Sequence, residues 1–272
     1  MPKLSSLLPY SLLLPFVALQ VEAQRHRPLP DPAVDRNGVP TWNNPEKFKH
    51  DTFTFVRIRY DSWQRGGKWA TDYPDSDLNF SYRLQQLTSL KVDPNGKILR
   101  ITDDDLKNHP FIYMIEPGHL EFSNAEVEAL RKYLLNGGFL MVDDFWGTDE
   151  YENFAFEFRR VFPKRELKEL PLEHPIFHTV FDLKVKPQVP AIQIALEGRS
   201  YGITWERGED GRQVSYKGCF DDKGRMMAIV CHNTDLGDGW EREGENHWYF
   251  KNFSEKYAYP MGINILVYAM TH

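Results

Sequence analysis

Two adjacent carboxylates, Asp143 and Asp144, directly follow the apolar run Phe139–Val142, which predicts a buried strand. The Gly pair 137–138 before this run is typical of the end of a helix. Ligands bind outside the carboxyl ends of the strands in an open α/β sheet. A carboxylate pair there can bind a ligand, or can act as acid and base in a hydrolase when its two pKa values differ.

Polar and aromatic residues also follow the other predicted core strands, 53–60, 111–115 and 226–230. Because the carboxyl ends of parallel strands meet at one edge of a sheet, we expect these side chains to line one crevice. His119 and His232 are candidate partners of Asp143 and Asp144 in catalysis. The candidate ligand-binding residues are Trp63, Trp69, Tyr73, Glu116, Trp146, Asn233, Asp235 and Trp240.

Each of these residues also has a purely structural interpretation. Asp143 or Asp144 can cap a turn, His119 can bond to a nearby backbone group, and Asp235 can belong to a tight turn. A metal site made from Asp143, Asp144, Glu116, His119 and His232 has acceptable ligand types, but its spacing matches no ligand motif. The sequence therefore predicts no resident metal and no cofactor.

The N-terminus resembles a secretory signal. Lys3 precedes the uncharged segment 4–19, and small residues around Ala23 form a cleavage site. We expect residues 1–23 to be removed and the protein to be exported, to the periplasm or beyond. No later segment is long enough to cross a membrane. Residues 24–50 contain five prolines and predict a linker or arm, and residues 51–272 predict a single domain.

Composition restricts the class of partner. The net charge is −6, with 33 Lys and Arg against 39 Asp and Glu, and no basic run is present. Such a chain lacks the electrostatic footprint of a nucleic-acid-binding protein. A small molecule or a saccharide is the expected partner class.

Strands and helices alternate along the predicted domain. Helices are expected over 75–90, 149–161 and from Pro260 onward, with a further helix that Ser123 and Glu126 start as a capping box. The core strands are apolar throughout rather than alternating, which favours a mostly parallel sheet covered by helices on both faces. A turn at 94–96 predicts a small hairpin within 92–101.

The only two cysteines, Cys219 and Cys231, fall on a predicted hairpin of segments 214–220 and 225–232. If Cys219 faces Met226, Cys231 lies roughly 17 Å farther along its strand. A disulfide needs Cα atoms within about 7 Å. We therefore expect two free, buried thiols.

Several segments resemble an uncharacterised bacterial family, domain of unknown function 4159. They are Arg57–Tyr60, Trp69–Pro74, Leu78–Leu84 and Gly137–Asp144. The resemblance extends over 53–271 and implies a flavodoxin-like fold of the class I glutamine amidotransferase-like group. A weaker likeness, carried by 174–176, 232–240 and 262–269, links the chain to trehalose-utilisation-like proteins of that fold group and implies a saccharide ligand.

The chain departs from true amidotransferases where their nucleophile lies. Those enzymes carry a Cys at the turn after a core strand, and Asp143 and Asp144 occupy that place here. Carboxylates are poor nucleophiles toward an amide, so the sequence predicts no glutaminase activity. The leading hypothesis is a binding domain without that activity. The alternatives are a hydrolase, possibly metal-assisted, that uses Asp143 and Asp144 with His119 or His232, and a structural or partner-binding protein of the envelope.

Overall fold

The computed structural model describes residues 29–48, 50–63 and 68–272. The predicted signal segment 1–23 lies outside these residues. Seven strands form the main sheet in the order β4-β2-β5-β6-β9-β8-β7. Their bounds are β2 Val56–Ile58, β4 Lys97–Leu99, β5 Phe111–Ile115, β6 Phe139–Asp143, β7 Lys168–Glu169, β8 Ser215–Phe220 and β9 Met226–His232.

The sheet is mostly parallel, as the sequence predicted. β4, β2, β5, β6 and β9 run in one direction, and β8 is antiparallel to both of its neighbours. Every residue of β5, β6 and β9 is buried. Except for Asp143 at the end of β6 and His232 at the end of β9, these three strands are hydrophobic because helices cover both of their faces.

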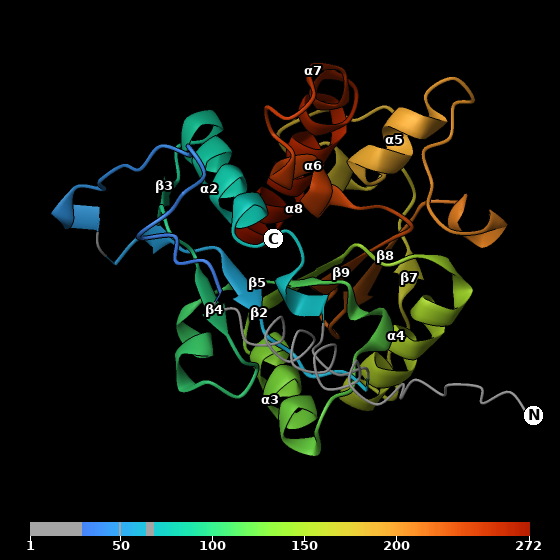
Figure 1. The fold of residues 1–272 in the computed structure, drawn as a ribbon. Helices are drawn as coiled ribbons and strands as arrows, with labels where there is room; N and C mark the ends of the chain where they lie inside the picture. The colour runs from blue at the N-terminus through green and yellow to red at the C-terminus, as the bar shows by residue number, and fades with distance from the viewer. Residues whose placement is uncertain (1–28, 49, 64–67) are drawn as a thin grey trace, which may run out of the picture.

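Helices pack on both faces of the sheet (Figure 1). α3 (Asn124–Leu135) and α4 (Gly147–Val161) cover one face. The other face carries α2 (Asp75–Leu87), α5 (Ile192–Gly198), α6 (Leu236–Glu241), α7 (His247–Tyr249) and α8 (Tyr259–Thr271), with the π-helical segment η7 (Phe250–Ala258) between the last two. Short single-turn helices lie at Glu46–Phe48, Lys68–Ala70, Asp104–Asn108, Pro117–His119, Pro175–Phe177 and Glu209–Gly211.

Two buried hydrophobic clusters match these two layers. One contains Phe80 and Leu84 of α2 with Ile263 and Leu266 of α8, and the other contains Leu130 of α3 with residues of α4. α3 begins with the predicted capping box. The Ser123 hydroxyl accepts the Glu126 N–H, and the Glu126 carboxylate accepts the Ser123 N–H at 2.8 Å.

The predicted hairpin within 92–101 is wrong. β3 (Lys91–Val92) pairs in parallel with β1 (Thr52–Phe53) in a separate two-stranded sheet, whereas β4 pairs in parallel with β2. The turn at 94–96 carries the chain from one sheet to the other. The Asp93 N–H donates to the Phe53 carbonyl, and the Lys97 N–H donates to the Phe55 carbonyl. Both sides of the turn are therefore bonded to the same short segment, residues 53–55.

β8 and β9 form the predicted hairpin, and both cysteines are free and buried, as predicted. The register differs by two residues. A bulge between Cys219 and Phe220 places Cys219 opposite Ala228, while Phe220 pairs with Met226. Cys231 pairs with Tyr216, so the two thiols remain apart on adjacent strands.

The described part of the Pro-rich arm packs along the domain. The Trp42 indole N–H donates to the Val92 carbonyl at 2.7 Å, and its ring lies 5.8 Å from that of Tyr82. The Arg36 guanidinium donates to the Pro94 carbonyl and to the Asn95 side chain, each at 2.7 Å. None of the helices in the described ranges is long and apolar enough to span a membrane.

Candidate functional site

The chain turns sharply at the carboxyl ends of the three central strands. Glu116 follows β5, Asp144 follows β6 and Asn233 follows β9, with φ of 47°, 55° and 60°. Asp72, in the loop that follows β2, has φ of 63°. This left-handed region is unfavourable for residues other than Gly, and its recurrence at one sheet edge is typical of a functional site.

Three of these loops bring carboxylates together. Oxygens of Asp72, Asp144 and Asp235 all lie within 4.8 Å of one another. Asp144 is 7% exposed and Asp235 is 5% exposed, while Asp72 is half-buried. We call these three residues the acidic cluster. The sequence predicted that strand-end loops would meet at this edge, and this cluster is where they do.

The acidic cluster has more acceptor oxygens than donors. Asp144 Oδ1 accepts the Trp146 indole N–H at 3.1 Å, and Asp235 Oδ1 accepts the Asp238 N–H at 2.7 Å as the N-cap of α6. The second oxygen of each receives no hydrogen bond from any described residue. Asp72 Oδ2 is completely buried and has no hydrogen-bond partner within the described ranges.

Gly237 allows Asp72 to approach the sheet edge. A Cβ atom at this position would lie 2.7 Å from Asp72 Oδ2 and 2.9 Å from the Tyr113 hydroxyl oxygen. Any side chain at position 237 would therefore displace the Asp72 carboxylate. The glycine is needed for space, because its backbone is helical at the start of α6.

The electrostatics of the acidic cluster favour a bound positive charge. Burial raises the pKa of Asp72, Asp144 and Asp235 well above the usual value for Asp, and repulsion among the neighbouring carboxylates raises each further. The repelling neighbours include Glu116 for Asp144 and Asp144 itself for Asp235. A proton or a cation at the cluster would relieve this repulsion.

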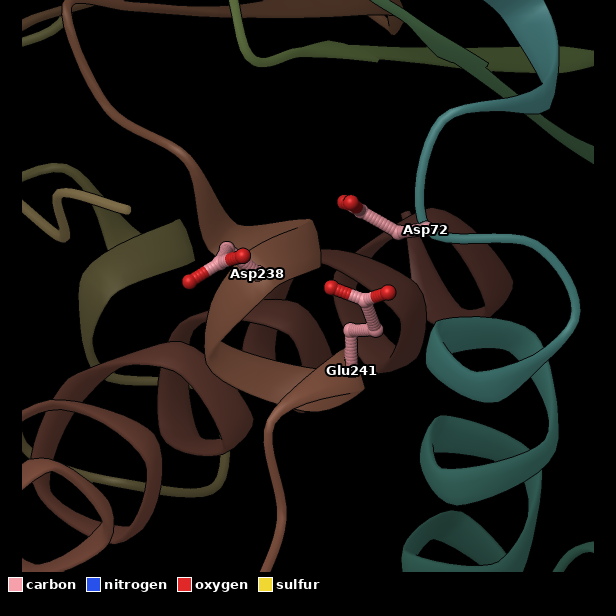
Figure 2. A group of neighbouring side chains, drawn as sticks. All are labelled: Asp72, Asp238 and Glu241. Atoms are coloured by element: carbon pink, nitrogen blue, oxygen red, sulfur yellow. The ribbon is translucent and has the colours of Figure 1, made fainter. Parts of the chain in front are cut away.

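Asp72 also faces a second acidic group on α6, formed with Asp238 and Glu241 (Figure 2). This group already has a cation. Arg242 Nε lies 3.2 Å from Asp238 Oδ1 and 2.7 Å from Glu241 Oε2. Asp238 Oδ2 accepts the Ile192 N–H at 2.7 Å and the hydroxyl of Tyr249 at 3.1 Å.

Asp143 binds the backbone at the start of α6, next to the acidic cluster. It is fully buried, and its Oδ2 accepts N–H bonds from Leu236 at 2.9 Å and Gly237 at 3.0 Å, together with the Tyr113 hydroxyl at 3.2 Å. Burial raises its pKa to about 7. Asp143 thus fixes the start of α6, while its neighbour Asp144 enters the acidic cluster. Adjacent residues in this turn have different roles.

The two candidate histidines lie in other environments. His119 packs its ring edge against Trp63, with ring centroids 4.8 Å apart. His232 is buried, and its Nε2 lies 2.9 Å from the Gly147 carbonyl oxygen. Among the described residues, neither ring is hydrogen-bonded to Asp143 or Asp144. The predicted pairing of a histidine with this carboxylate pair is not present in the structure.

The candidate tryptophans divide by exposure. Trp240 is fully buried against Phe80 and Phe55, and Trp69 and Trp146 are also buried. Their rings contact protein rather than solvent, because these loops fold down onto the core. Trp63 is 59% exposed.

Tyr73, Glu116 and Asn233 complete the set of candidates. Tyr73 is half-buried beside Asp72. Glu116 is paired with Lys68 and accepts the Thr71 hydroxyl at 2.9 Å. Asn233 holds the loops together, since its side chain accepts the Gly147 N–H and donates to the carbonyls of Asp210 and Gln213.

Asp72 is the main residue that sequence reasoning did not select. The available signal was its place in the loop that follows the first core strand, directly before the candidate Tyr73. Arg57 of β2 holds this loop, because its buried guanidinium donates to the carbonyls of Trp69 at 3.0 Å and Thr71 at 2.9 Å.

Two surface hollows lie away from the acidic cluster. Their volumes are about 510 Å³ and 740 Å³, and their linings include Pro110, Gly138 and Arg225, each directly before β5, β6 or β9. Both hollows therefore lie at the amino ends of the strands. A search for the binding site by surface shape alone would favour the amino edge of the sheet. The unpaired carboxylates favour the carboxyl edge.

Comparison with known proteins gives a family. The model of the family described as Domain of unknown function (DUF4159) matches residues 54–270. The chain belongs to this family. The resemblance expected from the sequence is therefore confirmed, and the match includes all residues of the acidic cluster. No curated protein matches the DUF4159 domain described above.

Proposed function

We propose that this DUF4159 domain is an exported ligand-binding domain. Its ligand is a hydroxyl-rich small molecule of the saccharide class, bound at the carboxyl edge of the sheet by Asp72, Asp144 and Asp235. Export rests on the signal-like segment 1–23. The structural part of the proposal rests on the acidic cluster alone.

The supporting observation is the set of unused acceptor oxygens in the acidic cluster. Among the described residues, Asp72 Oδ2 has no hydrogen-bond partner, and Asp144 and Asp235 each have one oxygen without a hydrogen bond. Leaving a buried oxygen such as Asp72 Oδ2 unpaired costs about 1–3 kcal/mol, more when it is charged. A ligand that donates several hydroxyl hydrogens would satisfy these oxygens at once.

Aromatic contact is the second element of the proposal. Tyr73 is the chain neighbour of Asp72 and is half-buried, so part of its ring is available beside the cluster. Flat faces of sugars commonly lie against such rings. The buried Trp69, Trp146 and Trp240 are assigned here to support of the loops, not to ligand contact.

The proposal also includes the finer fold assignment. A flavodoxin-like, class I glutamine amidotransferase-like arrangement is supported by the five parallel strands, the helices on both faces and the functional turn after β6. Under this assignment, the sharp turn at Asp144 would occupy the place of the nucleophile in that fold group. The saccharide class rests on the weaker sequence likeness to trehalose-utilisation-like proteins.

Calorimetric titration with a panel of mono- and disaccharides tests the binding proposal. We expect at least one ligand to bind to the mature chain, and Asp144→Asn to weaken its binding at least about tenfold. Asp105→Asn is the matched control, because Asp105 is an exposed carboxylate paired with Lys97 on the surface. No binding to any sugar, or equal loss in both variants, would contradict the proposal.

A hydrolase is the second candidate, and one observation favours it. The raised pKa values of Asp144 and Asp235 would keep one carboxyl protonated beside an ionised one, as acid–base catalysis requires. In this hydrolase hypothesis, Asp144 and Asp235 are the catalytic pair. They replace the combination of Asp143 and Asp144 with a histidine that the sequence suggested. Release of product from chromogenic glycosides that is lost in both Asp144→Asn and Asp235→Asn would support it; an inactive wild-type chain would not.

A further inference from the structure

We infer that Asp72, Asp144 and Asp235 coordinate a hard divalent cation of the Ca²⁺ or Mg²⁺ type. The inference rests on the proposed function only in that it assigns a resident ion to the same site. The sequence predicted no metal, because the spacing of the candidate ligands matches no ligand motif. Two of those candidates, His119 and His232, lie elsewhere in the structure.

The separation of the carboxylates fits an ion. Oxygens on opposite sides of Ca²⁺ are bonded at about 2.3–2.6 Å each, and those around Mg²⁺ at about 2.0–2.1 Å. Ligand oxygens of one ion are therefore up to about 4–5 Å apart. One oxygen from each member of the acidic cluster lies within 4.8 Å of the other two, so these separations do not exceed the span that one ion bridges.

A second, independent observation is the buried oxygen of Asp72. Asp72 Oδ2 is shielded from solvent and has no hydrogen-bond partner in the described part of the chain, and Gly237 leaves the space into which it projects. Asp144 and Asp235 are each more than nine-tenths buried, and each has one oxygen that no described residue bonds. Two buried carboxylates and a half-buried one, without an ion-pair partner among the described residues, favour a positive charge among them.

The neighbouring acidic group differs from the acidic cluster in having a charge partner, although Glu241 Oε2 has no hydrogen-bond partner among the described residues. Arg242 supplies its positive charge, and backbone and hydroxyl donors fill the remaining acceptor sites of Asp238. Among the described residues, none of the three members of the acidic cluster forms an ion pair, and Arg57, whose charge acts on Asp72, is paired with Asp77. A cation from solution would supply the missing positive charge.

The donor set indicates the kind of ion. Only carboxylate oxygens converge, and hard oxygen ligands suit Mg²⁺, Ca²⁺ and Mn²⁺ rather than soft or borderline metals. Three carboxylate ligands leave further coordination positions open. Water would occupy these positions in the absence of a ligand, and hydroxyl groups of a saccharide could replace it.

Calorimetric titration of the EDTA-treated and dialysed mature chain with CaCl₂ and MgCl₂ tests the inference. We expect one ion per chain, and a rise in melting temperature of about 5 °C or more at saturating ion. Asp144→Asn and Asp235→Asn are expected to weaken ion binding at least about tenfold. Asn retains helix capping at position 235 and removes repulsion, so both variants should fold without metal.

A matched variant separates the two acidic groups. Glu241→Gln removes a carboxylate from the group that Arg242 neutralises, and it should leave ion binding within about twofold of the wild-type value. No binding of either ion, or a loss with Glu241→Gln that exceeds the loss with Asp144→Asn, would overturn the assignment.

Repeating the titration with the sugar panel separates the inference from the proposed function. Ion binding without any sugar binding would support the cation site and contradict the saccharide ligand. Sugar binding that is unchanged in EDTA, with no ion bound, would support the ligand and overturn the cation site.

Discussion

The imidazole of His232 donates from Nε2 to the carbonyl oxygen of Gly147, at 2.9 Å. The carbonyl can only accept, so Nε2 carries the hydrogen. Burial lowers the pKa of His232 to about 4, which favours the neutral ring. Phe145 and Tyr151 enclose this ring, with centroids 5.0 Å and 4.9 Å away. The bond ties the end of β9 to the start of α4, on either side of the loop that carries Asp144.

Protonation of His232 is expected to destabilise the domain in acid. Burial lowers its pKa from 6.5 to about 4, so the unfolded chain binds a proton that the folded chain resists. The stabilising effect of the neutral ring is complete above pH 6.5 and is lost as the pH falls toward 4. Over this window the loss amounts to about 3 kcal/mol of unfolding free energy.

Urea unfolding at pH 4.5 and pH 7.5 measures this effect. His232→Gln can still donate to the Gly147 carbonyl but does not titrate, so its unfolding free energy should fall less between the two pH values than that of the wild type. The carboxylates titrate in both proteins and largely cancel in the comparison. An identical pH dependence in both would contradict the buried neutral histidine.

The ion pair between Arg57 and Asp77 should be essential for stability. Arg57 is fully buried and Asp77 is 2% exposed, with Nε lying 3.1 Å from Oδ1. Asp77→Ala would leave a buried, unpaired guanidinium, which costs about 3–5 kcal/mol. Chemical denaturation of the variant measures the loss.

The exposed pair of Lys97 and Asp105 provides the control for this prediction. Lys97→Ala removes an ion pair of similar length, 2.7 Å, from a site where both side chains are more than 40% exposed. Its effect should stay below about 1 kcal/mol. Equal effects at the two sites would show that burial does not determine the strength of this interaction.

Sequence patterns identified the elements of the fold well. The capping box at Ser123 and the apolar runs of β5, β6 and β9 rest on local physics, namely end-group hydrogen bonding and burial on both faces. The hairpin at 94–96 failed because pairing of β3 and β4 depends on strands that precede them in the chain. No local turn signal contains that information.

The candidate site was predicted only in part. The strand-end rule located Asp144 and Asp235, because parallel strands bring their carboxyl ends to one edge. It did not show that Asp143 turns inward to cap α6 while Asp144 turns outward, since one left-handed residue sets that difference. It also included Trp240, a side chain whose burial depends on α2 and α8, far away in sequence.

The left-handed conformation of Asp144 is expected to have a measurable cost. Its φ is 55°, which Gly adopts freely and Ala does not. Asp144→Gly and Asp144→Ala remove the same carboxylate, so the difference between them isolates the backbone. We expect the Gly variant to be the more stable by about 1 kcal/mol in thermal or urea unfolding. A more stable Ala variant would indicate that the turn relaxes on substitution.

Gly262 in α8 should resist replacement by Ala. Ala favours a helix by about 1 kcal/mol over Gly. The added Cβ would, however, lie 2.6 Å from Trp240 Cζ2 and 2.7 Å from Phe80 Cε2, both in rigid buried rings. Overpacking of this kind costs about 1–3 kcal/mol, so the net effect should be destabilising.

Urea midpoints compare this variant with a helix position that has no such contact. Gln193→Ala on the exposed side of α5 should change stability by less than about 0.5 kcal/mol. A Gly262→Ala variant as stable as the wild type would show that α8 can move away from the sheet.

The three carboxylates of the acidic cluster come from loops that are distant in sequence and are joined only through the sheet. Repulsion between these carboxylates disfavours the approach of the loops, and the packing of the folded core opposes it. Whatever neutralises the charge becomes a non-covalent cross-link between the first, middle and last parts of the domain. With the inferred cation bound there, the carboxyl edge would be the part of this molecule whose stability depends on the ions in the surrounding solution.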